Sequence, residues 1–139
     1  MVTINDSTVR ANVFETVYDL INSSLNSISA SSTPTLYAGY PDNNNIDFPI
    51  IIIKPVDVSK DTYTIDTTHT SNNKRISVFI EIYATKNKDL DIIADYITNL
   101  LDTPINGIFL SEVSDDFMFN TANNSKVKGK TLTLLFNRR

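Results

Sequence analysis

The side chains of this sequence that could do chemistry are a single histidine and three close pairs of aspartates. His69 lies in a polar, threonine-rich run, with no carboxylate or second histidine at a metal-ligand spacing. We therefore interpret it as a loop residue rather than a metal ligand or a catalytic base. The chain contains no cysteine, which excludes disulfides, thiolate metal sites and a cysteine nucleophile. A Ser/His/Asp triad has no supporting Gly-x-Ser-x-Gly context.

Neighbouring carboxylates could bind a divalent cation or act as the acid and base of a glycosidase. Asp89 and Asp91 fall in the first turn of a predicted helix, where negative charge interacts favourably with the helix dipole. Asp115 and Asp116 are typical of a bend. We therefore predict structural roles for these pairs, and we expect no catalytic residue, no metal and no cofactor. The pairs are Asp61 with Asp66, Asp89 with Asp91, and Asp115 with Asp116.

A strip of cations follows the last predicted strand. Lys126, Lys128 and Lys130 alternate along one face, and Arg138 and Arg139 end the chain. The simpler interpretation is a solvated sheet edge that discourages aggregation. The alternative is a strip that binds anions or pairs subunits.

The composition predicts one ordered domain over residues 1–139, because 41% of the residues are hydrophobic and 20% are charged. The formal net charge of -4 argues against a general nucleic-acid or anionic-membrane binder. The sequence has no stretch long and apolar enough to span a membrane and no secretory signal pattern. We expect the protein to be made in the cytoplasm.

The elements that position these side chains are organised around residues 74–101. Ile76, Val78, Ile80 and Ile82 fall on one face of a predicted strand. Apolar residues at helical spacing over residues 90–101 predict a helix that covers this face.

The rest of the chain predicts further helix and strand segments. A long amphipathic helix is expected over residues 7–28, a short strand over 35–40, and a buried isoleucine-rich strand over 48–58. Pro49 and Pro55 are expected at the start of that strand and at a bulge or edge segment, since proline cannot donate a ladder hydrogen bond. Residues 59–73 predict a long polar excursion, either a projecting hairpin or a flexible loop. A segment of this length is typical of one that contacts a neighbouring subunit or is partly disordered.

Two strands close the chain. Residues 108–113 predict a strand that continues after a kink at 116–120, and residues 126–136 predict its antiparallel partner. The fold class is therefore α+β, with a mixed, mainly antiparallel sheet of about four to five strands and two helices packed on one face.

This layout resembles the tail terminator and tail-completion proteins of long-tailed bacteriophages. The parts that carry the resemblance are the helix at 7–28, the strand at 48–53, the polar excursion at 59–73, the strand and helix at 75–101, and the hairpin that ends at Phe136. The resemblance implies a structural virion protein and not an enzyme. It implies a homo-oligomeric ring of about six subunits at the head-proximal end of the tail tube. Such a ring stops tube polymerisation and joins the tail to the head.

In that interpretation the partners are the tail tube protein and the head-connector or neck protein, and DNA passes through the ring without sequence-specific binding. An acidic lumen would use Asp89, Asp91 or Asp95 to let DNA pass without sticking. The candidate subunit or tube contacts, taken from their position in the chain, are Lys60, Asp61, Tyr63, Ile65, His69, Lys126, Lys128, Lys130, Arg138 and Arg139.

Three alternatives remain open at this point. The least favoured is an enzyme, for which a convergent acidic cluster that binds a divalent ion would be the discriminating observation. Another is a head-closure, neck or tail-tube protein of the same kind of virion. The third is a small cytoplasmic binding module with no viral role, for which a ligand-sized apolar pocket would be the discriminating observation.

Overall fold

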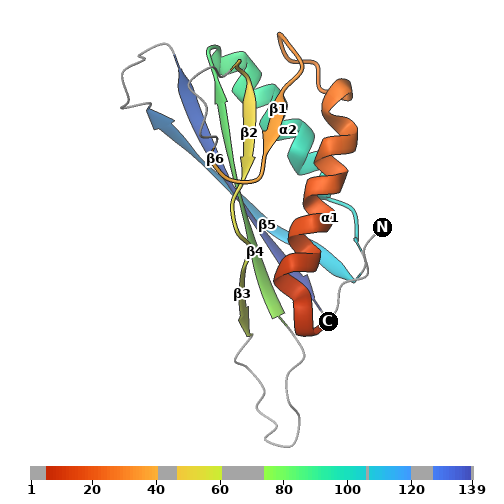
Figure 1. Cartoon of the computed structure of the whole chain (residues 1–139). Coiled ribbons are helices and arrows are strands. Elements are labelled where there is room, and N and C mark those ends of the chain that lie inside the picture. Colours follow the sequence, from red (N-terminus) through yellow and green to blue (C-terminus); the bar gives the residue numbers. More distant parts are fainter. Residues whose placement is uncertain (1–5, 41–46, 61–73, 106, 120–126, 139) are drawn as a thin grey trace, which may run out of the picture.

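A twisted sheet with both helices on one side forms the fold of the computed structural model (Figure 1). The structure describes residues 6–40, 47–60, 74–105, 107–119 and 127–138. The elements in chain order are η1 Asp6–Thr8, α1 Val9–Ser24, η2 Leu25–Ser27, β1 Thr35–Tyr37, β2 Ile50–Ile53, β3 Asp57–Lys60, β4 Lys74–Ala84, α2 Asn87–Leu101, β5 Ile108–Phe119 and β6 Lys128–Arg138.

The six described strands lie in the order β1-β2-β4-β6-β5, and β3 pairs with β4 beyond the end of β2. Strand β1 is parallel to β2, and the other pairs are antiparallel. The predicted α+β class is therefore confirmed, with one strand more than expected. The extra strand arises because the predicted strand over 48–58 divides into β2 and β3 around Pro55, which has no N–H to donate to β4.

The core lies between the sheet and the two helices, as the sequence predicted. Ile76, Val78, Ile80 and Ile82 of β4 are fully buried, and they share one apolar cluster with residues of α1 and α2. Burying each such side chain stabilises the fold by roughly 1.5–3 kcal/mol. The helix residues of this cluster include Val9, Val13, Val17 and Ile21 of α1 and Leu90, Ile93, Ala94, Ile97 and Leu101 of α2.

The opposite side of the sheet, here called the open face, carries the other residues of β4. Register places Tyr83 opposite Ile50 and Glu81 opposite Ile52. Ile50 and Ile52 are buried, although they lie outside the helix-side cluster. The isoleucine run of β2 is therefore buried on both faces, as its unbroken apolar pattern predicted.

The closing hairpin is longer and more regular than the sequence indicated. Strand β5 runs without a break through Asp115 and Asp116, so the predicted bend at this pair is wrong. The irregularity lies earlier, as a bulge between Leu110 and Glu112. The Ser111 hydroxyl donates a hydrogen bond to the Leu135 carbonyl at 3.0 Å, which ties the bulged residue to β6. Because of the bulge, Val113 pairs with Leu134 on the helix side, and Glu112 pairs with Leu135 on the open face.

A tight turn joins α2 to β5. Ile105 and Ile108 exchange two backbone hydrogen bonds of 3.0 and 2.9 Å. Gly107 within this turn has a φ of 89°, a conformation that side chains with a Cβ rarely adopt. The second helix ends at Leu101, where the helical spacing over residues 90–101 predicted its end.

Candidate functional site

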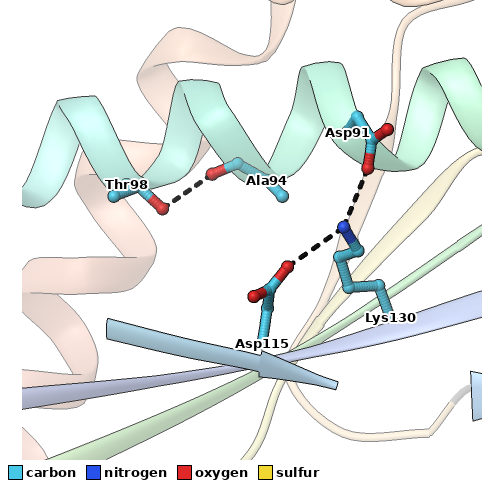
Figure 2. A network of polar contacts seen from close by, with 5 residues as sticks. All are labelled: Asp91, Ala94, Thr98, Asp115 and Lys130. Carbon is cyan, nitrogen blue, oxygen red and sulfur yellow. Dashed lines mark hydrogen bonds and ion pairs between the residues drawn. The ribbon is translucent and has the colours of Figure 1, made fainter. Parts of the chain in front are cut away.

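Lys130 joins a helix to the sheet (Figure 2). Its Nζ lies 2.8 Å from Asp91 Oδ1 on α2 and 3.1 Å from Asp115 Oδ2 on β5. The Lys130 side chain is only 15% exposed, whereas both carboxylates are largely exposed. The hydrogen bond to Asp91, followed by that to Asp115, raises the pKa of Lys130 above its usual value, against the opposing effect of burial. The ammonium group of Lys130 is therefore already paired with two carboxylates of its own chain.

The lysine strip does not form a sheet edge. Strand β6 lies between β4 and β5, so the predicted solvated edge is wrong for Lys128 and Lys130. Both residues lie opposite helix-side residues of β4, namely Ala84 and Ile82. Lys128 is half-buried. Arg138 is the last residue of β6, and Lys126 and Arg139 lie outside the described residues.

One of the three aspartates predicted to line an acidic lumen, Asp89, is buried. Asp89 is 4% exposed, and its Oδ1 accepts hydrogen bonds of 3.1 Å from both the backbone N–H and the hydroxyl of Ser31. The placement of Asp89 on a surface is therefore wrong, because its carboxylate ties the connector after η2 to the start of α2. Asp91 and Asp95 are exposed on α2.

Of the polar excursion over residues 59–73, the structure describes the first two residues, which belong to β3. Strand β3 runs as far as Lys60, whose backbone pairs with Lys74 of β4. The other candidate contacts of this segment, Asp61, Tyr63, Ile65 and His69, lie outside the described residues.

A buried carboxylate on the open face is a feature that the sequence interpretation passed over. Glu81 is 6% exposed, and its Oε2 has no hydrogen-bond partner within the described part of the chain. Lys54 Nζ lies 3.9 Å from Oε1. Burial, followed by the charge of Glu81, raises the pKa of Tyr83, and a hydrogen bond with Glu81 raises the pKa of Tyr40. The sequence signal that could have identified this feature is a charged residue, Glu81, inside a strand of alternating apolar residues.

An apolar pocket of about 360 Å³ lies between α1 and the strand segments at the β1 and β2 side of the sheet. We call it the α1 pocket. Helix α1 contributes Arg10, Ala11 and Phe14, and the strand side contributes Ala38, Gly39, Ile53, Pro55 and Val56. The charged residue in its lining is Arg10, whose Nη2 donates a hydrogen bond to the Val58 carbonyl at 3.4 Å.

The free edge of β5 carries a second candidate surface, which we define as Phe109, Glu112, Val113 and Asp116 and call the β5 surface. Phe109 is 42% exposed and Val113 is 37% exposed, and they are two of the three large hydrophobic residues that are exposed in the described chain. Glu112 and Asp116 are exposed and have no ion-pair partner among the described residues. This edge therefore combines apolar groups with unpaired negative charge.

The solved structures include a chain of the same fold. The protein described here is similar to a chain of the "Virion of native gene transfer agent (GTA) particle", with a TM-score of 0.53 and 13% sequence identity. The match covers 88% of the protein and 90% of the virion chain. The two chains share a fold. No family model and no curated protein matches the sequence.

Among the described residues, no group of three or more histidine, aspartate or glutamate side chains is arranged to hold a metal ion. No described helix is long and apolar enough to cross a membrane.

Proposed function

We propose that this protein is a structural component of a phage-like virion that acts as the tail terminator. It forms a homo-oligomeric ring of about six subunits at the head-proximal end of the tail tube, stops tube polymerisation and joins the tail to the head. The role is not enzymatic. The observation that carries the proposal is the likeness of fold to a gene transfer agent virion chain, which extends over 88% of this chain and 90% of that one.

The mechanism of this proposal is shape complementarity between rigid sheets. A ring of identical subunits closes when each subunit meets the next through two different patches and the rotation per subunit returns to the start. The sheet offers two chemically different edges for such a contact, the β1 and β2 side with the α1 pocket and the β5 side with its exposed strand. The partners at the two ends of the ring are the tail tube protein and the head-connector or neck protein.

The charge of the chain suits a channel for DNA. The net charge is -4, and Asp95 supplies an exposed carboxylate on α2, whereas the exposed carboxylate of Asp91 is paired with Lys130. A lumen of this sign repels the phosphate backbone, so DNA passes without sticking. The alternative within this proposal is a head-closure, neck or tail-tube protein of the same kind of virion.

The experiment that tests the proposal is the native mass of the purified protein with and without isolated tail tubes, followed by electron microscopy. A ring, or a monomer that becomes ordered at one end of the tube, supports the terminator role. A protein that decorates the whole length of the tube instead supports a tail-tube role. A small species that ignores tubes under both conditions contradicts the proposal.

The second candidate is a small binding module, and the α1 pocket favours it. A pocket of about 360 Å³ lined mainly by apolar side chains is of a size that takes a small ligand. The same native-mass experiment separates the two, because a binding module remains small and ignores the tail tube.

A further inference from the structure

We propose that the α1 pocket binds a small aliphatic carboxylate, with the carboxylate at Arg10 and the alkyl chain against the apolar lining. The inference rests on the second candidate function, for which it names the class of ligand, and it is independent of the terminator role. The observations that carry it are the position of Arg10, the apolar character of the other lining residues, and the pocket volume of about 360 Å³.

Arg10 is the charged residue of the pocket lining, and its guanidinium keeps unused donors. It is exposed at the start of α1, and its Nη2 donates a long hydrogen bond of 3.4 Å to the carbonyl of Val58 in β3. Since a guanidinium has five N–H donors in a planar fork, Arg10 can still bind a carboxylate through two parallel hydrogen bonds. No acidic residue of the described chain lines the pocket or forms an ion pair with Arg10. The guanidinium is therefore open to an anion from solution.

The rest of the pocket lining is apolar and is held in place by its neighbours. Phe14 stacks on Tyr18, with the ring centroids 6.2 Å apart and the ring planes 17° apart, which fixes the Phe14 ring on α1. Ile53 and Val56 are buried members of the helix-side cluster, so this part of the lining borders the core. Ala11 has a single methyl group and leaves room between α1 and the strand side. An alkyl chain placed here is removed from water with each methylene that it buries.

One cation beside an apolar lining selects an amphipathic anion. A neutral apolar molecule leaves the guanidinium without an anionic partner, a cationic amphiphile is repelled by it, and a small inorganic anion uses none of the apolar lining. The formal net charge of the chain is -4, so the attraction of a carboxylate has to come from Arg10 itself. The volume of about 360 Å³ lies within the range of small-molecule sites, which is about 300–1,000 Å³. The occupant we assign is therefore an aliphatic carboxylate of medium chain length.

The first test is isothermal titration calorimetry of the full chain with sodium octanoate, kept below the concentration at which octanoate forms micelles. Octanol and octylamine carry an alkyl chain of matched length with a neutral and a cationic head group, and acetate carries the carboxylate without the chain. Octanoate is expected to bind saturably and about tenfold more tightly than octanol. Octylamine and acetate are expected to show no saturable binding.

The second test changes the pocket. Arg10→Met removes the charge and keeps an unbranched side chain, so it should weaken octanoate binding about tenfold and leave octanol binding unchanged. Ala11→Leu narrows the pocket and should weaken the binding of both ligands. Lys88→Met on α2 and Asn22→Leu on α1 make comparable changes at exposed positions outside the lining, and they should bind octanoate as the natural protein does. Circular dichroism melts of each variant separate a lost site from a lost fold.

Three results would overturn the inference. They are the absence of saturable octanoate binding, binding of octanol or octylamine as tight as that of octanoate, and an unchanged octanoate affinity in Arg10→Met. The second candidate function fails separately. A protein that caps tail tubes and also binds octanoate would overturn the small-module role alone. A small species that ignores tubes and binds no octanoate would overturn this inference and leave that role standing.

Discussion

Lys130 shows how one side chain can serve two elements. Its ammonium group is shared by a carboxylate from α2 and one from β5, so it fixes the helix over the hairpin (Figure 2). Because both carboxylates are more than half exposed, water screens these ion pairs and limits their contribution to the free energy of folding. The burial of the lysine stem still makes the position sensitive to substitution.

We predict that Lys130→Met lowers the free energy of unfolding by about 1 kcal/mol, since it removes both charged hydrogen bonds and keeps the stem volume. Urea denaturation at low and high salt is the measurement, and the difference from the natural protein should shrink at high salt. Lys88→Met, at an exposed position of α2, is the matched control and should change little. If the loss in free energy of unfolding caused by Lys130→Met does not depend on salt, the loss comes from side-chain packing and not from charge.

Glu81 and Tyr83 form the other residue-scale feature. Burial and the charge of Glu81 raise the pKa of Tyr83 above its usual value of 10.0. The folded chain therefore holds the phenol proton more tightly than the unfolded chain does. The resulting stability is complete below the usual tyrosine pKa and is lost as the pH rises through the raised value.

We predict that Glu81→Gln brings the titration of Tyr83 to a lower pH, because the nearby negative charge is gone. The measurement is the ultraviolet absorbance of tyrosinate across the alkaline range, with Tyr83→Phe used to assign the signal. Alkaline loss of stability should also be smaller in Tyr83→Phe. A titration curve that is the same in Glu81→Gln and in the natural protein would show that burial rather than Glu81 sets this pKa.

At the scale of elements, Asp89 connects the segment after α1 to the start of α2. Its carboxylate accepts two hydrogen bonds from Ser31 and is almost fully buried. Removing such an acceptor leaves a buried donor unsatisfied. The role of Asp89 is therefore to hold the connector after η2 against the start of α2.

We predict that Asp89→Ala destabilises the fold by about 2 kcal/mol. Asp95→Ala, on the exposed side of the same helix, should stay within about 0.5 kcal/mol. Chemical denaturation of both variants measures the difference. Equal and small losses in free energy of unfolding would show that Asp89 contributes no more to stability than an exposed carboxylate does.

At the scale of the whole molecule, the proposed function depends on the assembly of subunits into a ring. If α2 faces the channel, Asp95→Lys should make assembled rings retain DNA, with a binding constant that falls steeply as salt rises. Asp19→Lys makes the same charge change on the exposed surface of α1 and is the control. Binding is measured by retention of DNA on immobilised rings, and equal retention by the two variants would remove α2 from the channel wall.

The sequence determined the class of the fold because its strongest signals are local. The alternation at Ile76 to Ile82 and the helical spacing from Leu90 to Leu101 each require one buried face, so the strand and its covering helix followed directly. Pro55 was likewise predicted at a bulge or edge segment of the isoleucine-rich strand, and that strand divides around it. These features depend on neighbours in the chain and need no knowledge of distant contacts.

Only the tertiary structure decided what the charged residues do. Lys130 and Asp91 are far apart in sequence, and Asp89 meets Ser31 across a separation of 58 residues. The position of β6 inside the sheet placed Lys128 and Lys130 away from any sheet edge, and Lys130 there pairs with two carboxylates. The bulge before Glu112 set which side chains of β5 face the helices. A charge in a sequence names no partner, because the partner is chosen by strand order and register, which arise from long-range packing.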